Sequence, residues 1–317
     1  MTATGATELP RYADLPRIEE LGARHAWTVF PPDDQLGRLN LISDEQVKAA
    51  GVEVQTGERF NLSFPLTLPD PSWSTQRKPL VHHVFEQNRN VRDDYLDQFY
   101  PQASSQWDGF RHVRAREFGF WQGAGEEIFD GDALGISAWA DHGIVTRGVL
   151  IDVAGHLERR GTPLDVRENV AIEVDLLVET LEAQNCVLRE GDVALIRTGY
   201  ADAYLAADRD ARADFADRRD CPGLHAGEEM AEFLWDSGVA AVVMDNPAIE
   251  SVPGDPAVGS LHRRLIPLLG FALGELFDLG ALARASARDE RWTCMFVGVP
   301  FTLPGGVGSP ANSIALR

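Results

Sequence analysis

The chain has 317 residues, of which 44% are hydrophobic and 25% are charged, as in an ordinary globular protein. Its formal net charge of -20 repels phosphates and argues against a nucleic-acid partner. No apolar stretch reaches the roughly 18 residues of a membrane span, and the first ten residues lack the basic and apolar parts of a secretory signal. Three widely spaced cysteines, Cys186, Cys221 and Cys294, fit a reducing compartment. We therefore expect a cytoplasmic protein with no membrane partner.

The first third of the chain predicts few regular elements. Residues 1 to about 20 are polar and suggest a loosely held, flexible arm. Ser43 begins a capping-box pattern that predicts a short helix through Ala50. Residues 59–66 alternate apolar and polar side chains, which predicts a strand. Residues 69–94 are rich in Pro, Asp, Gln and Arg, and we interpret them as a long loop of the kind that often binds ligands.

From residue 144 onward, helical and extended patterns alternate. Strands are predicted at 144–154, 191–199, 238–245 and 292–301, and an amphipathic helix is predicted at 166–184. Residues 201–220 suggest an exposed helix or lid, 226–236 a helix, and 261–268 the start of another. This alternation predicts an α/β fold. Neither an internal repeat nor a linker divides the chain, so we expect one domain over 1–317.

The stretch from Gln102 to His112 concentrates groups that bind metals or transfer protons. It contains two carboxamides, Gln102 and Gln106, the carboxylate of Asp108 and the imidazole of His112. If 106–108 is extended, Gln106 and Asp108 point to one side, and a helical turn from Asp108 would place His112 above it. The three side chains would then converge. The alternative is a strand-to-helix junction in which Asp108 caps the helix and His112 is solvated.

A second acidic position lies late in the chain. Glu275 ends an apolar run that follows His262, and an ionised glutamate buried there needs a cation or a strong donor. A bound metal is one such partner. A salt bridge to Arg263 or Arg264 is the alternative.

With these residues in view, the chain resembles the cyclase family that includes bacterial kynurenine formamidase and isatin hydrolase. The family signature is His-x-Gly-Thr-His-x-Asp-x-Pro-x-His, and residues 102–112 keep its spacing with glutamine at both leading histidine positions. Further landmarks follow in family order. They are the segments 191–199, 222–224 and 238–245, His262 with Glu275, and the Gly-Ser-Pro at 308–310. The resemblance covers most of residues 35–315.

The resemblance implies a metal site and a fold. It makes Asp108, His262 and Glu275 ligands of a divalent metal and His112 the proton-transfer residue, while Gln102 and Gln106 occupy the positions of two histidine ligands. Amide oxygen is a harder and weaker ligand than imidazole, so we expect one ion, with Mn2+ favoured over Zn2+. The implied fold is a mixed, barrel-like β-sheet flanked by helices, the kynurenine formamidase-like swivelling β/β/α fold, and the implied assembly is a homo-oligomer.

The implied activity is metal-dependent hydrolysis of an amide, lactam or lactone carbonyl in a small, ring-bearing molecule. Trp107 and Trp121, with Phe120 and Trp139, are candidates for an apolar substrate wall, although core packing is the alternative for each. His142 and Arg147 are candidates for holding a polar substrate group, with a surface salt bridge as the alternative. Two other functions stay open, namely a metal-dependent cyclase or dehydratase of natural-product metabolism and a non-catalytic small-molecule binding protein.

Overall fold

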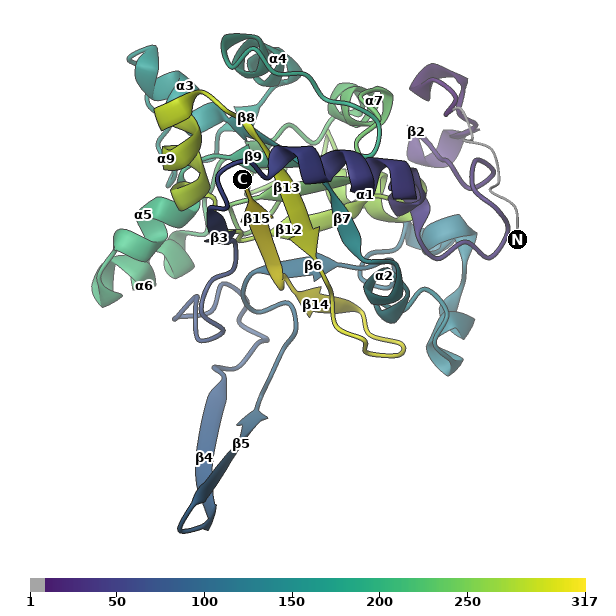
Figure 1. Cartoon of the computed structure of the whole chain (residues 1–317). Coiled ribbons are helices and arrows are strands. Elements are labelled where there is room, and N and C mark those ends of the chain that lie inside the picture. The colour runs from purple at the N-terminus through teal and green to yellow at the C-terminus, as the bar shows by residue number, and fades with distance from the viewer. Residues whose placement is uncertain (1–8) are drawn as a thin grey trace.

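The computed structural model describes residues 9–317, which are built around a nine-stranded mixed β-sheet (Figure 1). In spatial order, the strands are β14 (Gly308–Pro310), β6 (Gln106–Asp108), β12 (Ala272–Glu275), β11 (Ala241–Met244), β9 (Val193–Arg197), β7 (Ile144–Asp152), β13 (Thr293–Gly298), β15 (Ser313–Leu316) and β3 (Arg59–Asn61). The four strands from β12 to β7 are parallel, and the remaining pairings are antiparallel. The sheet curls into a half-barrel, so the predicted barrel-like α/β fold is confirmed.

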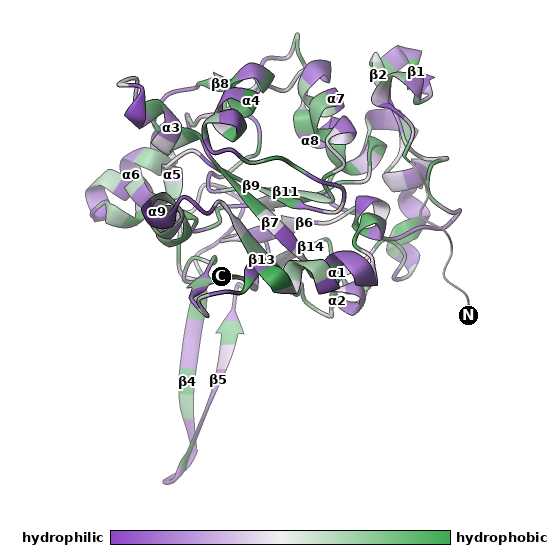
Figure 2. Ribbon diagram, turned by 45° about the horizontal axis from the view of Figure 1, so that its top comes forward, coloured by the Kyte–Doolittle hydropathy of each residue, from purple (hydrophilic) through white to green (hydrophobic). Residues whose placement is uncertain are grey.

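Helices cover both faces of this sheet. The helices α1 and α2 lie on one side, and α3, α4, α7 and α8 lie on the other (Figure 2). The α-helices are α1 (Asp44–Ala50), α2 (Ser137–His142), α3 (Val153–Arg159), α4 (Val174–Ala183), α5 (Tyr200–Ala206), α6 (Arg209–Arg218), α7 (Glu228–Asp236), α8 (Leu261–Arg263) and α9 (Gly280–Asp289). Residues 264–268 continue α8 as a π-helix. None of the described helices has an apolar run long enough to cross a membrane.

Short elements complete the architecture. Two pairs of two-residue strands lie outside the main sheet: β1 (Arg17–Ile18) with β2 (Ala23–Arg24), and β8 (Ala171–Ile172) with β10 (Gly223–Leu224). The 3₁₀ helices are Tyr12–Asp14, Glu19–Leu21, Gly37–Leu41, Gly51–Glu53, Arg116–Phe118, Trp121–Gly123 and Glu126–Asp130.

The interpretation of residues 69–94 as a loop is wrong in its second half. Strands β4 (Val81–Asn88) and β5 (Val91–Asp97) form an antiparallel hairpin that projects from the body (Figure 1). Its side chains are nearly all exposed. The polar composition that suggested a loop therefore reflects a ribbon with water on both faces, which has no buried face to impose a clear alternation.

Three other boundaries differ from the sequence analysis. Residues 1–8 of the predicted arm lie outside the described residues, and from Leu9 on the segment packs against the body, with Tyr12 and Leu15 each 2% exposed. The strand predicted at 59–66 ends at Asn61, and the helix predicted at 166–184 begins at Val174 because β8 precedes it. The helices predicted at 201–220 and 226–236 are present as α5, α6 and α7.

Candidate functional site

Strand pairing explains why two acidic side chains meet in the core. β6 runs antiparallel to β12, with Gln106 directly opposite Glu275 and Asp108 opposite Leu273. Side chains alternate between the faces of a sheet, so Gln106, Asp108 and Glu275 share one face. Trp107 points to the other face, where its ring contacts Phe277 and Phe296 edge-on. The predicted one-sided arrangement of Gln106 and Asp108 is therefore present.

His262 approaches this face from α8. Ser260 precedes the helix and its side chain accepts a hydrogen bond from the backbone N–H of Arg263, which fixes the first turn. The chain then widens into the π-helix at 264–268, which contains Pro267. Single π-turns of this kind are frequent at functional sites. This geometry carries the imidazole toward the carboxylates of β6 and β12.

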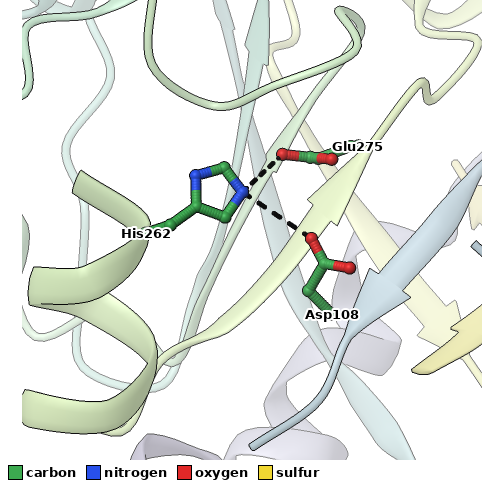
Figure 3. Close-up of side chains that lie close together, drawn as sticks. All are labelled: Asp108, His262 and Glu275. Carbon is green, nitrogen blue, oxygen red and sulfur yellow. Dashed lines mark ion pairs between the residues drawn. The ribbon is translucent and has the colours of Figure 1, made fainter. Parts of the chain in front are cut away.

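Asp108, His262 and Glu275 converge on one point (Figure 3). Nε2 of His262 lies 2.8 Å from Oε1 of Glu275 and 3.7 Å from Oδ2 of Asp108. One ligand atom from each residue lies within 4.8 Å of the others. Two carboxylate oxygens and one imidazole nitrogen at these separations form a donor set that could hold a divalent metal ion. The alternative partners of Glu275, Arg263 and Arg264, form no ion pair with it.

Both glutamines of the motif reach the same carboxylates. Nε2 of Gln106 donates to Oε2 of Glu275 at 2.8 Å and lies 3.3 Å from Oδ1 of Asp108, which also accepts a short hydrogen bond from Nε2 of Gln102. The amide groups therefore act as hydrogen-bond donors that brace the two acids. Each could instead turn its oxygen inward.

Burial and crowding shift the protonation of the cluster. Burial alone would raise the pKa of Asp108, but His112, His262 and Gln102 lower it to about 2. Burial and the nearby Asp108 raise the pKa of Glu275 to about 7. Burial works against a charged His262, yet Glu250 and Glu275 hold its pKa well above the usual range. The site thus concentrates more negative charge than its own cations neutralise, which favours a bound metal ion.

His112 lies at the edge of the cluster. Its Nε2 is 3.7 Å from Oδ1 of Asp108, and its side chain is 29% exposed. The backbone after Asp108 forms a turn, in which the N–H of His112 donates to the carbonyl of Gly109, rather than the helix considered from the sequence. The imidazole is therefore beside the carboxylates and still open to water.

Glu250 also belongs to the cluster, and it was not among the site residues predicted from the sequence. Its Oε2 lies 2.5 Å from Nδ1 of His262, and its Oε1 accepts from Ser260 Oγ at 3.0 Å. The neighbouring N–H of Ile249 donates to Oε1 of Glu275 at 3.0 Å. The available signal was weak. Glu250 lies in the segment that follows β11, six positions after its last residue, and sites in parallel sheets gather beyond the carboxyl ends of the strands.

The tryptophans proposed as a substrate wall belong to the core. Trp107 and Trp121 are fully buried, and Trp139 is 1% exposed. The indole N–H of Trp107 donates to the carbonyl of Ala311, and Trp121 stacks on Phe110. These tryptophans therefore pack in the core, which was the alternative to a substrate wall.

His142 and Arg147 also lie away from the cluster. Arg147 is on β7, which is separated from β12 by β11 and β9. Its guanidinium binds Asp192 through two hydrogen bonds of 2.9 and 2.6 Å. His142 ends α2, on the opposite side of the sheet from α8 (Figure 2). Arg147 therefore forms a salt bridge, but this bridge is largely buried rather than on the surface.

Comparison with known proteins identifies relatives of the chain. A family model described as "Putative cyclase" matches residues 60–251. A solved structure of a novel cyclase has 29% sequence identity and a TM-score of 0.81, over 92% of this chain and 99% of that one. No curated protein matches significantly.

Two isatin hydrolases share the fold. One, bound to the product analogue thioisatinate, has 12% identity and a TM-score of 0.57, over 87% of this chain and 99% of that one. Isatin hydrolase A from Ralstonia solanacearum has 15% identity and a TM-score of 0.58, over 87% and 98%.

Proposed function

The chain belongs to the cyclase family, and on that premise we propose that it is a metal-dependent hydrolase of an amide, lactam or lactone carbonyl in a small, ring-bearing molecule. The observation that carries this proposal is the convergence of Asp108, His262 and Glu275, with both carboxylates buried. Buried carboxylates at such separations need a cation. A hydrolase that activates water with a metal ion uses such a cluster.

We assign the site a single divalent ion held by Asp108, His262 and Glu275. Two hard carboxylate oxygens and one imidazole favour Mn2+ over Zn2+, and oxygen atoms of Gln102 and Gln106 would add to that preference. A second metal ion would need the two histidines of the family signature. This chain has glutamine at both of those positions, 102 and 106. An ion held by these residues would polarise the substrate carbonyl and would lower the pKa of a water molecule.

His112 transfers the proton in this proposal. It lies next to Asp108 but outside the three ligands, and its partial exposure leaves it accessible to water and substrate. Proton transfer by a positioned imidazole contributes about 100- to 10,000-fold to a rate. Oδ1 of Asp108 lies 3.7 Å from Nε2 of His112, so the carboxylate would attract a protonated imidazole and help to orient it.

We place the substrate ring in a cavity beside the motif. The cavity has a volume of about 170 Å³ and is lined mainly by the segments 66–72, 78–80 and 98–104. Phe99, Tyr100 and Leu66 give it apolar and aromatic walls, and its lining residues Ala103 and Ser104 directly follow Gln102 in the sequence. This cavity replaces Trp107 and Trp121 as the candidate ring pocket.

The same proposal covers the environment of the protein. We expect a small-molecule substrate and a homo-oligomer, as in the family that the chain resembles. We expect no nucleic-acid or membrane partner, because a net charge of -20 repels anionic surfaces. All three cysteines are free thiols, which supports a cytoplasmic location.

Two alternatives rest on particular observations. The 29% identical structure is described as a cyclase, which favours ring closure or loss of water at the same carbonyl. The glutamines that donate to Asp108 and Glu275 favour a binding protein that holds its acids without a metal.

Metal analysis and an activity assay separate these readings. Protein purified without chelators is analysed for metal and then assayed on isatin-like and N-formyl aromatic compounds with added MnCl2. One ion per chain and metal-dependent hydrolysis support the proposal. Ring closure without hydrolysis supports the cyclase alternative, and no ion with no metal-dependent thermal shift supports the binding protein.

A further inference from the structure

The imidazole of His262 is held from both sides. Its Nε2 faces Glu275 and Asp108, and its Nδ1 lies 2.5 Å from Oε2 of Glu250. The backbone N–H of His262 also donates to this oxygen, at 3.2 Å. One carboxylate oxygen therefore binds the ring and the main chain of the same residue, which leaves the histidine little freedom to rotate.

We propose that Glu250 is a positioning residue that fixes the ring orientation and tautomer of His262, so that Nε2 is the nitrogen available to the metal. This inference rests on the proposed function, because it assumes that His262 is a ligand. A carboxylate that accepts the Nδ1 proton leaves the lone pair on Nε2 and makes that nitrogen more basic. In this proposal Glu250 acts through His262, to which it is hydrogen-bonded, and is not itself a ligand.

The backbone of Glu250 is fixed independently of the cluster. Its neighbours pair with β10, where the N–H of Leu224 donates to the carbonyl of Ile249 at 2.8 Å and the N–H of Ser251 donates to the carbonyl of Leu224 at 3.2 Å. Gly223 permits this approach, since a Cβ there would lie 2.3 Å from the Glu250 carbonyl carbon. A rigid support of this kind is what a metal ligand needs to keep its geometry.

The second oxygen of Glu250 is occupied as well. Ser260 Oγ donates to Oε1 at 3.0 Å, and Ser260 also caps the helix that carries His262. The carboxylate thus links the segment 249–251, which pairs with β10, to the first turn of α8. The neighbouring Ile249 N–H binds Glu275, so one short segment orients two of the three ligands.

The test measures metal affinity rather than turnover. Isothermal titration of the full chain with MnCl2 compares wild type with E250Q, E250A and S260A. Loss of an outer partner of a metal-bound histidine weakens binding about 10- to 100-fold. We expect E250Q to weaken manganese binding about 10-fold, because its amide oxygen can still accept a hydrogen bond from Nδ1. We expect E250A to weaken it about 100-fold. The matched control is E232Q, which changes an exposed glutamate on α7 and leaves affinity unchanged.

A spectroscopic readout separates positioning from simple structural support. In the zinc-loaded protein, long-range proton–nitrogen NMR spectra show which nitrogen of His262 carries the proton. Wild type should keep it on Nδ1 with Nε2 bound, and E250A should lose that single form. If E250A does not fold, E250Q and S260A still carry the comparison.

The outcomes distinguish the two levels of inference. Wild type that binds no divalent metal would overturn the proposed function together with this role of Glu250. Wild type that binds metal while E250Q and S260A bind it within twofold would overturn the positioning role alone.

Discussion

Replacing Asp108 with asparagine tests the link between the acidic cluster and a metal ion. The change keeps the shape of the side chain and removes a charged ligand. Asp108 is fully buried, and its pKa of about 2 against the usual 3.8 corresponds to about 2 kcal/mol of stability. Because this pKa is lowered, the contribution is present above pH 4 and is lost as the pH falls toward 2.

In the metal-free protein, Glu275 offsets part of the stability that D108N would lose. Its pKa is raised from 4.5 to about 7 by burial first and by Asp108 second, so its ionisation in the folded state costs about 3 kcal/mol above pH 7. D108N removes the negative charge of Asp108 and so lowers the free-energy cost of ionising Glu275. We therefore expect the metal-free variant at pH 8 to differ from wild type by less than about 2 kcal/mol.

The metal-loaded proteins should differ more clearly. At a metal concentration 100 times the dissociation constant, binding stabilises wild type by about 2.7 kcal/mol. For a chain of 317 residues, this raises the melting temperature by about 4 °C. D108N should show no such increase. Thermal unfolding at pH 8 measures the melting temperatures of wild type and D108N, first with EDTA and then with MnCl2.

The control is D141N, which removes an exposed carboxylate far from the site in sequence. With MnCl2, D141N should show the same increase in melting temperature as wild type. A D108N variant that still gains about 4 °C would show that Asp108 is not a ligand and would refute the reasoning.

Three further predictions concern the surrounding residues. H112A should keep the manganese-dependent thermal shift and lower kcat about 100- to 10,000-fold in a hydrolysis assay, whereas equal loss of metal would show that His112 is a ligand. Q102H combined with Q106H should strengthen zinc binding at least about tenfold by titration, because imidazole is a better zinc ligand than an amide, and unchanged affinity would argue against both positions. Glu275 and His262 hold protons at neutral pH because their pKa values are raised, and a metal must displace them. Manganese affinity should therefore rise between pH 6 and 8 with proton release in calorimetry, and a constant affinity would contradict this.

The sequence predicted the parts of the site that depend on local pattern. Extended geometry at 106–108 placed Gln106 and Asp108 on one face, and Glu275 at the end of an apolar run indicated a buried acid. The resemblance to the cyclase family then joined His262 to them, although it lies 154 positions after Asp108 in the sequence. The pairing of β6 with β12 brings Glu275 next to Asp108, and α8 carries the imidazole of His262 to both carboxylates.

The sequence could not predict features that depend on tertiary contacts. Glu250 follows a loop after β11. It meets His262 only because α8 packs against the segment that contains Glu250, and no local pattern in the sequence indicates that contact. Trp107 alternates with two site residues, yet its side chain faces the opposite layer of the core, where Phe277 and Phe296 pack against it. The hairpin β4–β5 lacks a buried face, so its polar sequence resembled a loop.

The central claim is that Asp108, His262 and Glu275 bind one divalent ion. Anomalous diffraction from a crystal soaked in MnCl2 tests it most directly. The account predicts a single manganese peak per chain, within about 2.4 Å of an oxygen of Asp108, an oxygen of Glu275 and Nε2 of His262. A featureless map at these side chains, or a manganese peak bound elsewhere, would contradict it.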